Sequence, residues 1–109
     1  MRENQKLYVV TREDLSPGSQ AVQGMHALTE FSMYFPREYE AWYRESNHLC
    51  FLSVKNEHEL DLLCGMLFRE GVQYSMFREP DLNMSLTAIA IEATDQASAL
   101  VKDLPLALR

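Results

Sequence analysis

Residues 16–27, SPGSQAVQGMHA, open a helix and carry a row of polar side chains along it. Ser16 can cap the first free backbone amides, and Pro17 suits the first helical position. The polar residues follow one another at spacings of 4, 3 and 4, which places them on one helix face; they are Ser19, Gln23, His26 and Glu30. The start of such a helix favours anions, but an ordinary surface helix also carries a polar stripe. Spacing alone leaves both interpretations open.

The composition predicts a single domain over residues 1–109 without a membrane span. Of the 109 residues, 47% are hydrophobic and 10% aromatic, which suffices for one core. The longest apolar runs are far shorter than the ~20 residues of a transmembrane helix, and the start MRENQK lacks the apolar centre of a signal peptide. We therefore expect a cytoplasmic protein. A net charge of −6 is the opposite of the basic surface expected for a nucleic-acid binder.

Apolar periodicity alternates between short strands and longer helices. The expected strands cover residues 7–12, 48–55, 72–79 and 86–92, and the expected helices cover about residues 19–34, 37–46, 56–71 and 95–104. Helices that connect strands favour parallel neighbours in the sheet. The pattern therefore predicts an α/β, three-layer sandwich with a mixed, mostly parallel four-stranded sheet and helices on both faces.

Residue patterns within these elements give expectations for packing. The run HLCFLSVK, residues 48–55, is nearly all apolar and predicts a strand covered on both faces. Asp95 is expected to cap the last helix, and the alternation of leucines over 104–108 allows a short edge strand there. The apolar face expected for the first helix is Ala21, Met25, Leu28 and Ser32. An aromatic cluster is consistent with either core packing or a homodimer; its members are Phe31, Tyr34, Phe35, Tyr39, Trp42 and Tyr43.

The order of motifs resembles that of the type-2 peptidyl-tRNA hydrolase family. In that family a first strand leads into Asp-Leu and then Gly-Lys-x-x-Ala-Gln-x-x-His-Ala; this chain has KLYVVTREDL and then GSQAVQGMHA at residues 18–27. Further on, the family has a strand, a helix closed by Gly, a strand ending in Arg-Asp-Ala-Gly and a last strand beginning Thr-Val. This chain offers FLSVK, EHELDLLCGMLFREG, MFREPD and LTAIAI in that order, so the resemblance covers about residues 6–108.

The chain departs from the family pattern at polar positions. The family lysine that follows the glycine falls on Ser19. The acidic residue after Arg78 is Glu79, and Asp81 comes two places later. A hydroxyl cannot supply the fixed positive charge of an ammonium group, so the rate or the RNA affinity should fall unless Arg12 or Arg78 compensates.

The resemblance implies hydrolysis of the ester that joins a peptide to the 3′ adenosine of tRNA, with no metal or cofactor. It implies a catalytic set that offers an amide, a hydroxyl and carboxylates able to accept a proton from water; this set is Gln23, Glu79, Asp81 and Thr87. The substrate-binding set that it implies is Gly18, Ser19, His26 and Arg78. The catalytic set should converge near the start of the first helix. The position of His26 suits either a site residue or one that only ties down a nearby backbone carbonyl.

A second class of function stays open, namely a non-catalytic relative that binds a protein or a small molecule in the same cleft. Ser19 and the net charge of −6 favour this class, and the acidic charge argues against tight binding of peptidyl-tRNA. Gln23, Thr87 and the paired acids favour the enzyme.

Overall fold

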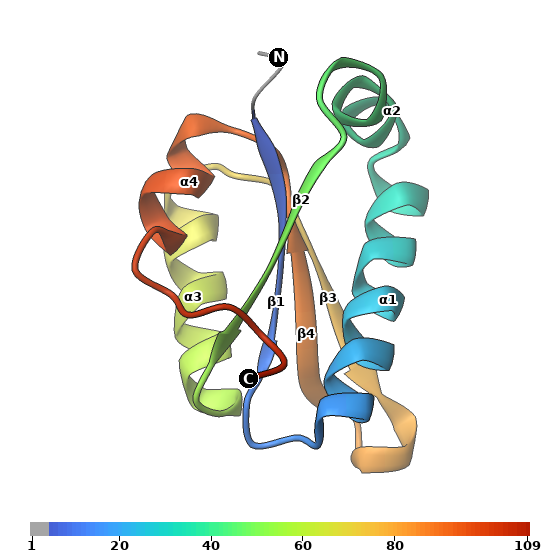
Figure 1. The fold of residues 1–109 in the computed structure, drawn as a ribbon, viewed down its shortest axis with the longest axis vertical. Coiled ribbons are helices and arrows are strands. Elements are labelled where there is room, and N and C mark those ends of the chain that lie inside the picture. The colour runs from blue at the N-terminus through green and yellow to red at the C-terminus, as the bar shows by residue number, and fades with distance from the viewer. Residues whose placement is uncertain (1–4) are drawn as a thin grey trace.

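A mixed four-stranded sheet lies between two layers of helices in the computed structural model, which describes residues 5–109 (Figure 1). Residues 1–4, the first part of the start MRENQK, lie outside the described residues. The strands are β1 (Lys6–Arg12), β2 (His48–Val54), β3 (Tyr74–Glu79) and β4 (Ser85–Ile91). The helices are α1 (Pro17–Tyr34), α2 (Pro36–Glu45), α3 (Glu57–Arg69) and α4 (Asp95–Val101), with a 3-10 turn at Pro80–Leu82. Helices α1 and α2 cover one face of the sheet and α3 and α4 the other, which confirms the α/β architecture with helices on both faces.

The strand order β2-β1-β4-β3 shows that the prediction of a mostly parallel sheet was wrong. Only β1 and β2 pair in parallel, whereas β4 is antiparallel to both of its neighbours. It follows that β1, β2 and β3 run in one direction and that β4 alone runs against them. The short turn at Pro80–Leu82 folds β4 back beside β3. Because β4 also pairs with β1, it separates β3 from the other two strands.

Strand β2 is an edge strand and is buried only in its second half, so the prediction that residues 48–55 are covered on both faces was wrong for the first half. Its first half is open, with Leu49 51% exposed. The C-terminal segment lies along its second half, where Leu106 forms an isolated antiparallel bridge with Leu52. The edge strand expected over 104–108 is thus reduced to one bridge. Two backbone hydrogen bonds flank it, from Ser53 N–H to Pro105 C=O at 2.9 Å and from Ala107 N–H to Phe51 C=O at 2.9 Å.

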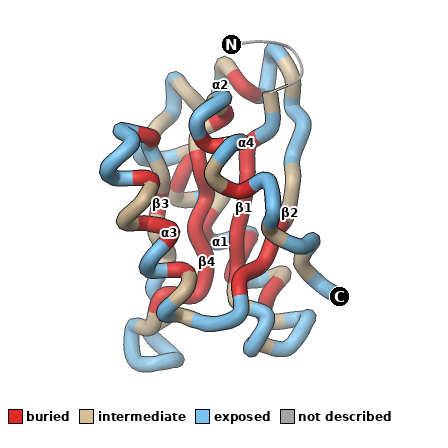
Figure 2. Tube along the Cα trace, turned by 90° about the vertical axis from the view of Figure 1, so that its left-hand side faces the viewer, coloured by how far each residue is buried: buried red, intermediate tan, exposed pale blue. Residues whose placement is uncertain are grey.

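Two apolar clusters fill the spaces on either side of the sheet. On β1, Leu7 and Val9 belong to the cluster under α1 and α2, whereas Tyr8 and Val10 belong to the cluster under α3 and α4. Figure 2 shows the buried stretches concentrated along β1 and β4 in the middle of the sheet. Because both central strands are buried on both faces, they form a rigid base for any side chain mounted on them.

Helix α1 turns a different face to the sheet from the one predicted. Leu28 of the expected apolar face does pack against the core, but Met25 is 60% exposed, so the expected face was wrong at Met25. The buried residues of α1 are Gln20, Gln23, Gly24, Ala27 and Phe31. A Cβ at Gly24 would stand 2.7 Å from Cζ of Phe51, so the missing side chain lets the helix approach the sheet closely.

The aromatic cluster of α1 and α2 is divided between the core and the surface. Phe31 and Trp42 are buried, and the indole N–H of Trp42 donates to the His48 carbonyl at 2.7 Å. Tyr34 and Tyr43 are 68% and 59% exposed. The homodimer stays a prediction.

Candidate functional site

An irregularity in the pairing of β3 with β4 places Thr87 opposite helix α1. Phe77 pairs with Ala88 and Arg78 pairs with Leu86, so Thr87 has no partner across the ladder. Such a bulge re-aims the side chain of the extra residue. The hydroxyl of Thr87 consequently leaves the regular alternation of β4 and meets a side chain from α1.

Three hydrogen bonds in series connect the centre of the sheet with the surface. The Thr11 hydroxyl donates to the Thr87 carbonyl at 2.9 Å. The Thr87 hydroxyl donates to Gln23 Oε1 at 2.6 Å, and Gln23 Nε2 donates to Glu79 Oε1 at 2.9 Å. Each link fixes the next, because a carboxylate can pair only with the nitrogen end of the Gln23 amide, which leaves its oxygen end for the Thr87 hydroxyl.

The inner members of this series are closed to solvent. Thr87 is fully buried and Gln23 is only 4% exposed. Their polar atoms satisfy one another, as buried groups must to avoid a desolvation cost. Glu79 is the last residue of β3 and is half-buried. It is therefore the residue of this series that solvent can reach.

The carboxylate of Glu79 is held in its charged form. The hydrogen bond from Gln23 lowers the pKa of Glu79 most, and a hydrogen bond from the Asp81 backbone amide to Oε2 at 3.3 Å and the nearby charge of His26 lower it further. Glu79 is thus ionised at neutral pH. Asp81 lies exposed in the turn that follows and reaches the site through its backbone amide.

His26 lies one turn after Gln23 on α1 and is exposed. Its imidazole stacks on the ring of Phe77, with the ring centroids 4.4 Å apart and the planes 6° from parallel. Among the described residues His26 thus contacts the ring of Phe77, and the interpretation that it ties down a backbone carbonyl stays a prediction. His26 follows Gln23 by three residues on α1, so it lies next to the polar series.

The remaining candidate binding residues divide between the two faces of the sheet. Gly18 and Ser19 lie in the first turn of α1, where the Ser19 amide donates to the Ser16 hydroxyl at 3.3 Å. Ser19 precedes Gln23 by four residues and so shares its helix face. Arg78 follows the strand alternation to the opposite face, where it lines a cavity of about 390 Å³ beside α3. The structure therefore does not bring Arg78 to the group formed by Gln23, Glu79 and Thr87.

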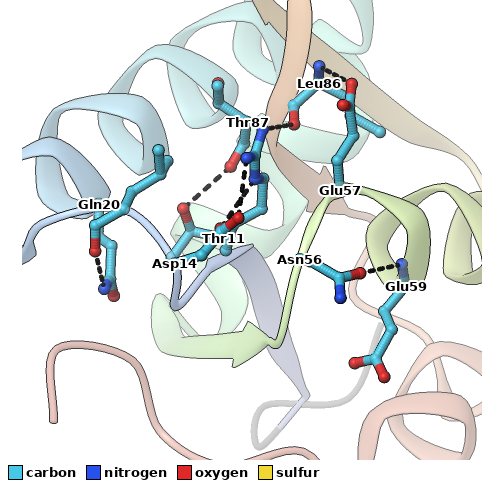
Figure 3. Close-up of polar contacts among 10 residues, drawn as sticks. Thr11, Asp14, Gln20, Asn56, Glu57, Glu59, Leu86 and Thr87 are labelled. Carbon is cyan, nitrogen blue, oxygen red and sulfur yellow. Dashed lines mark hydrogen bonds and ion pairs between the residues drawn. The ribbon is translucent and has the colours of Figure 1, made fainter.

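Supporting residues that the sequence analysis did not assign to the site hold the backbone before Thr87 (Figure 3). The Glu57 carboxylate accepts from the Leu86 amide at 2.7 Å, and Arg12 donates to the Leu86 carbonyl at 3.2 Å. Arg12 also forms an ion pair with Asp14 at 3.0 Å, and its side chain is only 14% exposed. This pairing raises the pKa of Arg12 and lowers that of Asp14. The guanidinium is already committed to these partners, so it does not replace the missing lysine.

Neither a metal cluster nor a membrane helix is present in the described part of the chain. Over residues 5–109, no group of three His, Cys, Asp or Glu side chains is placed to hold a metal ion. No helix in that range is both long enough and apolar enough to cross a membrane.

Comparison with known proteins identifies a family and a similar fold. A sequence model of the family described as Peptidyl-tRNA hydrolase PTH2 matches residues 5–107. No curated protein gives a significant match. A solved structure of a protein of unknown function from Agrobacterium tumefaciens strain C58 is similar, with a TM-score of 0.72 and 8% identity; the match covers 97% of this chain and 98% of the other. At that identity the likeness concerns the fold.

Proposed function

Because the chain belongs to the peptidyl-tRNA hydrolase PTH2 family, we propose that it hydrolyses the ester between a peptide and tRNA at the site formed by Gln23, Glu79 and Thr87. The observation that carries the proposal is the continuous series of hydrogen bonds from the buried Thr87 hydroxyl to the Glu79 carboxylate. Such a series holds one charged group in a fixed position beside the surface, which is the requirement for directing a water molecule.

In this mechanism Glu79 orients the attacking water and accepts its proton. Gln23 and Thr87 are positioning residues, because both are buried and bonded to each other. The exposed Asp81 is a secondary acceptor in the same turn. The backbone amide of Gly18 in the first turn of α1 binds negative charge on the substrate, since the Ser19 amide is taken up by the Ser16 cap.

The charge of the site predicts a slow enzyme. Ser19 brings no cation, and Arg12 is neutralised by Asp14. The lowered pKa of Glu79 also makes it a weaker base than a carboxylate tuned to neutral pH. The net charge of −6 should weaken the attraction for tRNA phosphates further.

The same features support a second candidate, a binding module that has kept the fold and lost the reaction. Gln23 and Thr87 satisfy each other, so their bond stabilises the fold whether or not the chain is an enzyme. An ionised Glu79 without a neighbouring lysine would suit a ligand that carries hydrogen-bond donors.

Release of labelled peptide from a model peptidyl-tRNA distinguishes the two candidates. Glu79→Gln should lower kcat/KM by about 100-fold or more, the usual contribution of a general base. Asp103→Asn, which removes an exposed carboxylate after α4, is the matched control and should retain activity within a few-fold. If the folded wild type releases no peptide, the hydrolase function is refuted and the binding module becomes the preferred candidate.

The pH profile of the same reaction tests the role of Glu79. A depressed pKa means that activity is complete above the ordinary range of a glutamate and is lost as the pH falls through the lowered value. Gln23→Ala removes the main cause of that shift, so the acid limb should move up toward 4.5, the ordinary value for a glutamate. An acid limb that stays in place in this variant would show that another group controls the reaction.

A further inference from the structure

We propose that the stacked rings of His26 and Phe77 form a platform for the terminal adenine of tRNA. The inference rests on the proposed function, because it assigns the nucleobase part of the substrate to this surface. Its basis is the near-parallel stack itself, with ring centroids 4.4 Å apart and planes 6° from parallel. Unpaired RNA bases commonly stack on aromatic side chains, including histidine and phenylalanine.

The platform has one anchored ring and one open ring. Phe77 is half-buried and packs against the apolar cluster under α1 and α2, so it cannot turn freely. His26 is exposed although Phe77 covers one of its faces. We place the ligand on the face of His26 that is turned away from Phe77. A planar ligand on that face would extend the stack by one ring.

The local charge favours a base over a phosphate at this place. Glu79 is ionised beside His26, and Ser19 supplies no cation. Phosphate oxygens are repelled by a carboxylate, whereas a neutral base is not. The exocyclic amino group of adenine is a hydrogen-bond donor, which suits a carboxylate acceptor. Stacking also tolerates an acidic protein better than phosphate contacts, because it does not depend on counterion release.

The position of the stack relative to the polar series supports this assignment. His26 follows Gln23 by three residues on α1, and Phe77 precedes Glu79 by two residues on the same face of β3. The platform and the carboxylate are therefore neighbours on both elements. An adenine held on His26 would present the ribose of the scissile ester on the side of Glu79.

The test measures binding of a trinucleotide, so it does not require hydrolysis. The probe is the RNA trinucleotide CpCpA labelled with fluorescein at its 5′ end, whose fluorescence anisotropy rises on binding, titrated at low salt with the wild type and three variants. His26→Asn removes the ring and should weaken binding roughly 5-fold or more, the effect of losing one base-stacking contact. His26→Phe keeps a flat ring and should bind within about threefold of the wild type, by the same argument. His58→Asn, on α3 beside Arg78 at the opposite face, should leave binding unchanged.

Competition and folding complete the experiment. Unlabelled CpCpA should displace the probe better than CpCpU, because the purine offers a larger stacking surface. Circular dichroism should show all variants folded, since His26 is exposed. Failure of the wild type to bind, or equal binding by the wild type and His26→Asn, overturns the platform. If the wild type and His26→Asn bind the trinucleotide equally but the wild type still releases peptide, the platform is refuted and the proposed function is unaffected.

Discussion

Replacing Thr87 with valine removes one hydroxyl while keeping the shape of the side chain, so it removes the buried 2.6 Å hydrogen bond to Gln23 together with a longer, 3.3 Å contact to the Phe77 carbonyl. The variant leaves the amide oxygen of Gln23 without a donor at a position that is only 4% exposed. A buried acceptor without a partner costs about 2 kcal/mol, within a range of about 1–3 kcal/mol. For a domain of this size that corresponds to a fall in Tm of about 10 °C.

A double-mutant cycle shows whether this cost comes from the bond. Gln23→Met replaces the amide with an apolar chain of similar length, so valine at 87 then leaves no orphaned oxygen. Loss of both partners is close to neutral in comparable cases. The double variant should therefore be at least ~1 kcal/mol more stable than the sum of the single effects predicts. Urea unfolding at neutral pH, followed by circular dichroism, gives the four free energies of unfolding.

Thr29→Val is the matched control for Thr87→Val. The Thr29 hydroxyl donates to the Met25 carbonyl on the exposed side of α1, where water can take its place. Its loss should change the free energy of unfolding by less than ~0.5 kcal/mol. The reasoning is refuted if Thr87→Val is as small as the control, or if the cycle is additive.

Three further predictions concern charge, packing and thiol reactivity. Ser19→Lys places an ammonium one turn before Gln23 and should raise both the affinity for tRNA, measured by filter binding at low salt, and the rate of peptide release. If neither rises, the site cannot use a cation. Gly24→Ala should lower the free energy of unfolding, measured in urea, by about 1–2 kcal/mol, because the ring of Phe51 must shift. In the control Gly65→Ala the new Cβ would be 4.0 Å from its nearest neighbour, so the free energy of unfolding should rise by up to about 1 kcal/mol. Cys64, whose pKa is raised to about 12 mainly by burial, should react with a thiol reagent at pH 8 only after unfolding, and fast reaction of the native protein would contradict its burial.

Element ends were predictable from the sequence where a single residue determines them. Ser16 accepts from the Ser19 amide as an N-cap, Asn56 caps α3 by accepting from Glu59, and Gly71 adopts a φ of 71° after that helix. The last helix is an exception, because Thr94 and not Asp95 provides the cap. Both residue types cap helices well, so composition could not choose between neighbours.

Strand neighbours and the buried face of α1 were not predictable in this way. The helices that connect β1, β2 and β3 predict that these strands run in the same direction, and they do. An apolar pattern does not indicate the order of strands in the sheet, so the position of β4 between β1 and β3 could not be predicted. On α1, the exposed Met25 and the buried Gln23 invert the usual hydropathy rule. The inversion follows from tertiary partners, since Gln23 is bonded on both sides of its amide.

Most residues of the candidate site could be inferred from the sequence, but not which carboxylate is bonded to Gln23. Resemblance to the family pointed to Gln23, Glu79 and Thr87, whose convergence depends on a bulge that leaves no clear mark in the sequence. The choice of Glu79 over Asp81 depends on which carboxylate meets the glutamine. Thr11 was overlooked because threonine in a strand is ordinary β-sheet composition. Arg78 could have been excluded, because strand alternation places it on the face opposite Glu79.

The geometry of the site depends on close packing between α1 and the sheet, and only weakly on residue 19. Gly24 lets the helix sit against Phe51, and Ala88 and Ala90 present small side chains to the same layer. The backbone of α1 therefore lies low enough for the side chain of Gln23 to reach Thr87 and Glu79 together. Ser19 is half-buried in the first turn and does not belong to this packed layer, so a change of charge at residue 19 should leave the packing as it is. The hydrogen-bond series can thus persist whether or not the cation is present, and kinetics with Ser19→Lys would measure the contribution of charge alone on an unaltered frame.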